Sequence, residues 1–174
     1  MFLSPQEILR HVVIPSSSRV ADFGTGKGYF GLEIARRLGT EATVYVFDPY
    51  TPSLEAVRRE AKKMHAPLYA LLADLNLHIP VRANLFTHAI VANTLYQLRD
   101  RARFVQELSR VVEPGGVVLV ADWLGSFNNM GPMREEVLSP SDAVQLFADA
   151  GFETSGMLPA GTHHFAFRAT CRTH

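Results

Sequence analysis

The sequence is short of cysteine, of excess charge and of long apolar runs, and each shortage excludes a class of protein. The single cysteine, Cys171, cannot form an internal disulfide or a thiolate metal cage. A chain without disulfides is typical of a reducing compartment, so we expect a cytoplasmic protein. No apolar run approaches the ~18 residues that span a membrane. The N-terminal apolar stretch is interrupted by Pro5 and Glu7, which is not the pattern of a signal peptide.

The charge balance argues against polyanionic partners. Lysine plus arginine number 17, as do aspartate plus glutamate, so the formal net charge is zero. Proteins that bind duplex DNA or an anionic membrane surface usually carry a basic surplus. We therefore expect a small-molecule substrate, with no nucleic acid partner and no membrane span.

What the sequence does contain is a regular alternation of strand and helix patterns within one domain of 174 residues. Strands are expected at residues 18–23, 42–48, 67–74, 85–93 and 117–123, and two more close the chain after residue 151. Helices are expected at residues 29–39, 51–64, 100–112 and 138–151, and the third of them stops at the "EPGG" of residues 113–116. Asp100 and Ser139 are expected to be the N-caps of the last two. This alternation is typical of a doubly wound α/β sheet, whose ligands bind beyond the carboxyl ends of the strands.

A glycine-rich turn, "GTGKG" at residues 24–28, follows the first expected strand, and its spacing discriminates between ligands. A nucleoside triphosphate loop needs a serine or threonine after Gly-Lys, but Gly28 follows Lys27 here. A dinucleotide fingerprint needs a third glycine at position 29, which lets the helix pack close to the strand, and the phenol of Tyr29 would crowd that packing. Asp48 lies about 20 positions further on, where an acid binds a ribose, but it would suit the ribose of any nucleoside ligand equally. Tyr29 therefore disfavours a nicotinamide cofactor, and Asp48 keeps that cofactor from being eliminated.

The turn fits better as Asp-x-Gly-x-Gly-x-Gly, and here the chain resembles the class I S-adenosylmethionine-dependent methyltransferases, in their UbiE-like, type 11 branch. The resemblance runs over residues 18–170, through the ordered segments "VADFGTGKGYFGLEIARRLG", "VYVFDPY", "LLADLNLHIPV", "FTHAIVANTLYQL", "ELSRVVEPGGVVLVADW" and "LSPSDAVQLFADAGF". It implies a mostly parallel seven-stranded sheet with the last strand antiparallel and helices on both faces. Residues 1–17 would form a short helical segment before a single cofactor-binding domain at 18–174.

The resemblance also implies which residues hold the cofactor, S-adenosylmethionine. Asp22 would face the amino group of the methionine part, Asp48 the ribose hydroxyls, and Asp74 the adenine amino group. Asn93 and Thr94 would border the methionine tail. The full implied set is Asp22, Gly24, Thr25, Gly26, Gly28, Asp48, Pro49, Tyr50, Asp74, Leu75, Asn93 and Thr94.

Each acid also has a purely structural interpretation. Asp22 could cap the glycine turn, Asp48 could cap the helix that follows it, and Asp74 could hydrogen-bond its own loop. Lys27 is expected to be solvated.

The sequence does not single out a catalytic base. Methyl transfer from a sulfonium is an in-line displacement that needs alignment and exclusion of water, and a base only if the acceptor must lose a proton. Candidates near the expected strand ends are Tyr96, Asp122, His163 and His164. The adjacent histidines would point to opposite faces of a strand, so no metal site is expected there.

The methyl acceptor is specified mainly by what is missing. "ANTLYQL" stands where methyltransferases of adenine or glutamine amino groups carry an Asn/Asp-Pro-Pro-aromatic motif, and there is no Pro-Cys nucleophile for cytosine. We expect a small, partly apolar acceptor. Because the segment before residue 18 is short, a homodimer or another partner could cover the site.

Two alternative functions remain open. The chain could be a catalytically silent S-adenosylmethionine-binding domain that acts as a partner or regulatory subunit. Less consistent with the turn is an NAD-dependent oxidoreductase, suggested by Gly24, Gly26 and Asp48.

Overall fold

A computed structural model of the chain describes residues 3–127 and 130–172. Its centre is a seven-stranded sheet in the order β3-β2-β1-β4-β5-β7-β6. The strands are β1 (Arg19–Phe23), β2 (Thr43–Asp48), β3 (Leu68–Leu72), β4 (Phe86–Ala92), β5 (Val112–Trp123), β6 (Phe152–Thr154) and β7 (His164–Cys171). Strands β1 to β5 pair in parallel, whereas β7 is antiparallel to both β5 and β6. The predicted seven-stranded sheet with an antiparallel last strand is confirmed.

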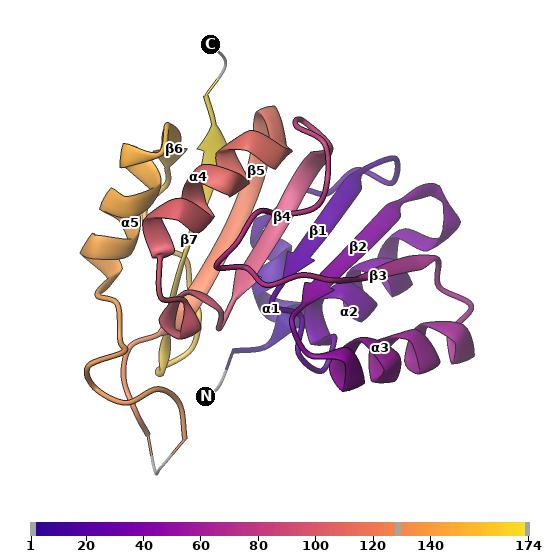
Figure 1. The fold of residues 1–174 in the computed structure, drawn as a ribbon, viewed down its shortest axis with the longest axis horizontal. Coiled ribbons are helices and arrows are strands. Elements are labelled where there is room, and N and C mark those ends of the chain that lie inside the picture. Colours follow the sequence, from indigo (N-terminus) through magenta and orange to yellow (C-terminus); the bar gives the residue numbers. More distant parts are fainter. Residues whose placement is uncertain (1–2, 128–129, 173–174) are drawn as a thin grey trace.

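Helices cover both faces of the sheet (Figure 1). Apolar side chains of α1 (Pro5–Ile8), α2 (Tyr29–Leu38) and α3 (Thr51–Lys63) pack on one face, and those of α4 (Arg101–Val111) and α5 (Pro140–Asp149) pack on the other. Short 3₁₀ turns lie at η1 (Leu9–His11), η2 (Gly39–Glu41) and η3 (Leu95–Gln97). Within the described ranges, no helix is both long and apolar enough to cross a membrane.

The expected break between α4 and β5 is absent. The prediction placed a turn at residues 113–116 and began the strand at residue 117, but β5 starts directly at Val112. The register against β4 shifts between the Phe86–Val112 pair and the His88–Val117 pair, and Gly115 has a φ of 81°. The Pro-Gly-Gly sequence therefore forms a bulge inside the strand instead of the predicted turn, and glycine and proline are compatible with both structures.

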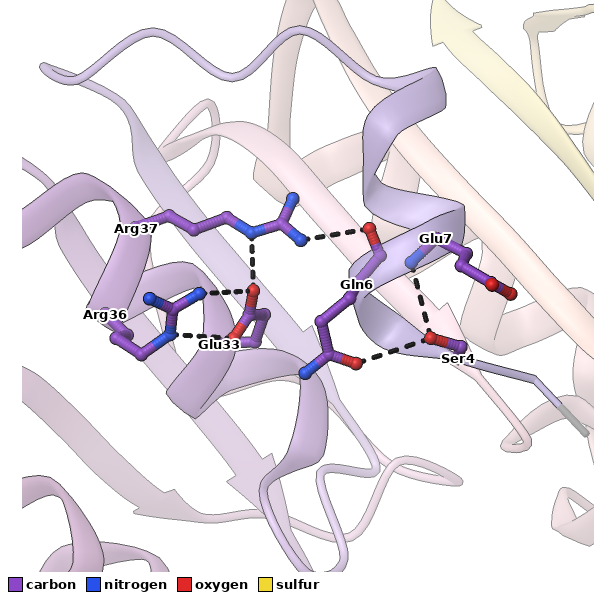
Figure 2. Close-up of polar contacts among 6 residues, drawn as sticks. All are labelled: Ser4, Gln6, Glu7, Glu33, Arg36 and Arg37. Carbon is purple, nitrogen blue, oxygen red and sulfur yellow. Dashed lines mark hydrogen bonds and ion pairs between the residues drawn. The ribbon is translucent and has the colours of Figure 1, made fainter.

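The N-terminal segment is fixed on α2 by both apolar and polar contacts, and Figure 2 shows the polar ones. Ile8 and Leu9 are buried in the same apolar cluster as the core face of α2. Arg37 Nη2 donates to the carbonyl of Gln6 (3.0 Å), while Arg37 Nε donates to Glu33 (2.6 Å). Hydrogen bonds from Arg36, reinforced by Arg37, lower the pKa of the Glu33 carboxyl to about 2. The polar contact to the segment is thus the hydrogen bond from Arg37, whose guanidinium also pairs with the charged Glu33 on its own helix.

The connection between β3 and β4, residues 73–85, contains no helix and is held by two side chains of α4. Glu107 accepts a hydrogen bond from the amide of Ile79 (2.8 Å), and Arg110 donates to the carbonyls of Ile79 and Val81 (2.8 Å each). This anchoring fixes the middle of the connection on α4, and nearer its start the amide of Arg99 donates to Asn76 Oδ1 (2.8 Å).

Candidate functional site

A cavity of about 350 Å³ opens at the carboxyl ends of the parallel strands, a size suited to a small ligand. It is lined by Gly24, Gly26, Asp48, Pro49, Tyr50, Ser53, Asp74, Leu75, Asn76, Thr94, Gln97 and Leu98. Most of the predicted cofactor residues therefore come together here. Four of them, Asp22, Thr25, Gly28 and Asn93, do not line the cavity, and Ser53, Asn76, Gln97 and Leu98 were not predicted.

The glycine turn is built on left-handed backbone and close packing. Gly24, Gly26 and Gly28 have φ values of 74°, 52° and 80°. A Cβ on Gly24 would overlap Thr94 Oγ1, and one on Gly28 would come within 2.6 Å of Val57 Cγ2. Nothing lies within 4 Å of the corresponding point on Gly26, which leaves that stretch of backbone open to a ligand in the cavity.

The glycine that packs the helix against the sheet is Gly31, not position 29. A Cβ on Gly31 would approach Val46 Cγ1 to 2.5 Å, whereas Tyr29 is 64% exposed. A phenol at position 29 therefore does not crowd the packing, and the argument against a dinucleotide from Tyr29 loses its physical basis.

Asp48 joins the glycine turn to β2 at the wall of the cavity. Its Oδ2 accepts from the amide of Gly26 and its Oδ1 from the amide of Tyr50, both at 2.9 Å. Tyr50 is the N-cap residue of α3, and no side chain caps that helix. Each carboxylate oxygen has a second lone pair, so the group can still accept hydrogen bonds from a ligand.

Asp22 lies beneath the turn, away from the cavity lining. Its Oδ2 accepts from the Thr25 hydroxyl (2.6 Å) and from the amide of Gly31 (2.9 Å), and its exposed fraction is 2%. Burial raises the pKa of its carboxyl to about 6, against the lowering effect of these two hydrogen bonds. The observed contacts are those of the structural interpretation, in which Asp22 holds the turn.

Replacing Asp22 with asparagine tests this burial through pH. Because the folded pKa of about 6 exceeds the ordinary 3.8, the folded state binds more protons than the unfolded chain between these values. The wild type is therefore stabilised by protonation below pH 3.8 and loses that stability as the pH rises through about 6. As the pH is raised from below 3.8 to neutral, we expect the free energy of unfolding of Asp22→Asn to increase by on the order of 1–3 kcal/mol relative to that of the wild type.

Urea unfolding at both ends of that range measures the difference. Asp74→Asn is the control, since the pKa of the exposed Asp74 carboxyl is lowered and its pH dependence has the opposite sign. If the two variants shift in the same direction, the Asp22 carboxyl does not titrate as its burial implies.

The end of β4 carries an unsatisfied polar atom next to the cavity. Asn93 has a φ of 55°, its amide donates to Ala121 (2.9 Å), and its carbonyl accepts from Gln97 Nε2 (2.7 Å). Its Oδ1 is buried with no hydrogen-bond partner in the described part of the chain. The neighbouring Thr94 hydroxyl donates to the carbonyl of Phe23 (2.9 Å) and lines the cavity. A strained residue with an unpaired acceptor is a typical sign of a binding site.

The far wall of the cavity is formed by the loop after β3. Asp74 Oδ1 accepts from the amide and the side chain of Asn76 (2.9 and 3.0 Å), which lowers the pKa of the Asp74 carboxyl. Leu75 is buried at 3% exposure, and Tyr50, which also lines the cavity, is 63% exposed. The predicted loop hydrogen bond of Asp74 is present, and its carboxylate still borders the cavity.

The candidate catalytic residues do not form one cluster. Asp122 accepts from the amides of Trp123 (2.8 Å) and Tyr96 (3.3 Å), and burial raises its pKa to about 6. His164 pairs in register with Trp123, one residue beyond Asp122, so the two side chains point to opposite faces of the sheet. The His163 ring lies 4.0 Å from the Phe127 ring, centroid to centroid, with the two planes tilted by 32°. Across residues 3–127 and 130–172, no three His, Cys, Asp or Glu side chains are placed to hold a metal ion.

Comparison with known proteins gives one family. Residues 21–120 match the family described as "Methyltransferase domain". The chain is 30% identical over 109 residues to a 2-phytyl-1,4-naphtoquinone methyltransferase of Nostoc punctiforme, covering 62% of this chain and 47% of that protein. It is 23% identical over 114 residues to a demethylmenaquinone methyltransferase of Staphylococcus saprophyticus, covering 66% and 48%. The chain spans about half the length of these relatives.

Solved structures agree on the fold. A SAM-dependent methyltransferase from Aquifex aeolicus superposes with a TM-score of 0.87 at 24% identity, covering 97% of this chain and 90% of that one. The [4+2]-cyclase SpnF superposes with a TM-score of 0.81 at 13% identity, covering 98% and 80%. At such identities the likeness shows the fold and not the reaction.

Proposed function

Because the chain belongs to the methyltransferase domain family, we propose that its cavity binds S-adenosylmethionine and that the protein transfers the methyl group to a small, partly apolar acceptor. The observation that carries the proposal is the pairing of an open glycine backbone at Gly26 with the carboxylate of Asp48 in one cavity. An adenosyl ligand needs this combination of close backbone approach and an acceptor for two ribose hydroxyls.

The residues present fit this cofactor. Asp48 would accept from the ribose hydroxyls, and Asp74 with the buried Leu75 would border the adenine. The unpaired Oδ1 of Asn93 would accept from the ammonium group of the methionine part. Asp22 would act indirectly, by holding the turn through Thr25. The cofactor, when bound, supplies a methyl carbon already activated on a sulfonium.

The protein's own task is then alignment of the acceptor and exclusion of water. The acceptor's electron pair forms the new bond to the methyl carbon, and the electron pair of the broken carbon–sulfur bond stays on sulfur. Any proton lost by the acceptor passes to solvent or to a nearby base. No single base is needed for this step if the acceptor is already electron-rich.

An apolar acceptor is supported by two observations. The curated relatives are named as methyltransferases of a phytyl naphthoquinone and of demethylmenaquinone. Beside the carboxyl end of β5, the large apolar side chains of Leu124, Phe127, Met130 and Met133 are 38–67% exposed. Exposed apolar groups at a site edge favour a ligand with apolar surface.

A catalytically silent cofactor-binding domain is the second candidate. It is favoured by the separation of Asp122 from His164 and by the occurrence of this fold in a [4+2]-cyclase. It predicts binding of the adenosyl compounds without release of S-adenosylhomocysteine from any acceptor tried, including reduced 1,4-naphthoquinone.

Thermal unfolding with S-adenosylmethionine, S-adenosylhomocysteine, NAD and ATP in parallel tests the cofactor. At a hundredfold excess over its dissociation constant, a bound ligand adds ~2.7 kcal/mol, which raises the midpoint by roughly 5–10 °C for a domain of this size. We expect the rise with the two adenosyl compounds. A rise with NAD alone would contradict the proposal and favour the oxidoreductase.

A further inference from the structure

Asn76 lines the cavity and makes polar contacts with two of its walls. Its backbone amide and its side-chain Nδ2 both donate to Asp74 Oδ1, at 2.9 and 3.0 Å, on the wall that follows β3. Its side-chain Oδ1 accepts from the amide of Arg99 (2.8 Å), next to Leu98 on the wall that follows η3. A backbone amide only donates and a charged carboxylate only accepts, so one orientation of the Asn76 side chain satisfies both contacts. The residue therefore bridges the two walls.

The loop that carries Asp74 is fixed in its backbone as well. The amide of Ala73 donates to the carbonyl of Asp48 (3.2 Å), and the amide of Leu77 donates to the carbonyl of Asp74 (2.9 Å). The two hydrogen bonds from Asn76 lower the pKa of the Asp74 carboxyl, and the charge of Arg99 lowers it further. Asp74 is thus an ionised acceptor that points in one direction. Both bonds from Asn76 go to Oδ1, so Oδ2 can accept from a ligand in the cavity.

A carboxylate held in one direction can distinguish two purine bases. Adenine has a donor amino group at position 6 and an acceptor at N1, whereas hypoxanthine has an acceptor oxygen at position 6 and a donor at N1. A fixed carboxylate accepts from the 6-amino group and repels the 6-oxo group. A carboxylate that is free to turn can accept from N1–H instead, and it then binds both bases. Selectivity therefore depends on what holds the carboxylate in place.

We propose that Asn76 is a positioning residue that makes the cavity selective for a 6-aminopurine. The inference rests on the proposed function, in which adenine lies beside Asp74 and Leu75, and adds the residue that sets the choice of base. Asn76 acts through Asp74, because its two donors hold Oδ1 and so direct Oδ2 at the base. The hydrogen bond from the Arg99 amide in turn keeps the Asn76 side chain from rotating away.

Calorimetric titration with two compounds tests the inference. S-adenosylhomocysteine carries the 6-amino group, and S-inosylhomocysteine carries a 6-oxo group with a hydrogen on N1. The readout is the ratio of their two dissociation constants, because a general change in the shape of the cavity weakens both compounds together. We expect the wild type to bind S-adenosylhomocysteine more tightly by about 10-fold or more, since the wrong base loses a hydrogen bond to a charged group.

Asn76→Asp separates the two contacts of the side chain. It keeps an oxygen for the Arg99 amide, loses the Nδ2 donor and places a second carboxylate against Asp74. Two adjacent carboxylates share a proton or turn apart, and either change makes the 6-oxo group more acceptable. We expect the ratio to fall by about fivefold or more.

Two further variants complete the comparison. Asn76→Ala removes both side-chain contacts, so it should weaken both compounds and also lower the ratio, by about threefold or more. His78→Ala is the matched control, since His78 is exposed on the same connection and contacts Glu107 (2.9 Å) on α4. It should keep the ratio of the wild type.

Three results would overturn the inference. They are similar affinities of the wild type for the two compounds, an unchanged ratio in Asn76→Asp, and an equal fall of the ratio in His78→Ala. The binding of S-adenosylhomocysteine to the wild type is scored separately. If the wild type does not bind it, the proposed function fails, whereas normal binding together with any of the three results defeats only the role of Asn76.

Discussion

Asp48→Ala is expected to weaken binding of S-adenosylhomocysteine at least 100-fold. The substitution removes an acceptor for the ribose hydroxyls, and it also frees the amide of Gly26, which Asp48 holds at 2.9 Å. Hydrogen bonds to a charged group contribute about 1.5–3 kcal/mol each, so the loss of two corresponds to a factor of 100 or more in affinity. The open glycine backbone and the carboxylate act together, because the Asp48 carboxylate fixes the position of the Gly26 amide.

Isothermal titration calorimetry measures this loss, and Asp100→Ala is its control. Asp100 is also an aspartate at the edge of a helix, where it caps α4 by accepting from the amide of Arg103 (2.9 Å). Its removal should lower stability by about 1 kcal/mol and leave the affinity for the ligand unchanged. An Asp48→Ala protein that binds S-adenosylhomocysteine as tightly as the wild type would show that Asp48 does not accept from the ribose hydroxyls and would contradict the proposed position of the ligand.

The sequence was sufficient for the fold because its local signals agree with its long-range pattern. Asp100 and Ser139 were expected at helix caps, and both side chains accept from backbone amides in the first turn. The bulge at Gly115 was missed because the same residues also make ordinary turns, and only the register between β4 and β5 distinguishes the two.

The site was predictable where a motif fixes the backbone and less so where side chains meet across the fold. Gly24, Gly26 and Asp48 follow directly from strand ends. The cavity contacts of Ser53 and Gln97 depend on how α3 and η3 begin, which no spacing in the sequence reveals. The role of Gly31 follows from its approach to Val46 on the neighbouring strand, a contact between distant parts of the chain.

Gly24→Ala should destabilise the protein by about 2–4 kcal/mol and abolish cofactor binding. The turn holds residue 24 in a left-handed conformation with a φ of 74°, which costs an alanine roughly 1 kcal/mol more than a glycine. It also overlaps the hydroxyl of Thr94, which is itself held by a hydrogen bond to the carbonyl of Phe23. Forcing a methyl into such packing costs about 1–3 kcal/mol more. If the turn shifts to relieve the overlap, Gly26 moves with it and the cavity changes shape.

Chemical denaturation compares this variant with Gly151→Ala. Gly151 has a φ of 90° and nothing within 4 Å of its Cβ position, so its substitution reports the backbone cost alone. Combining Gly24→Ala with Thr94→Ala removes the overlapping hydroxyl and should cost less than the sum of the two single changes, because the second substitution makes room for the first. Two results would contradict this prediction. One is an equal loss of unfolding free energy for Gly24→Ala and Gly151→Ala, and the other is strict additivity in the double variant. Either would mean that the contact between the glycine turn and the end of β4 does not constrain the site.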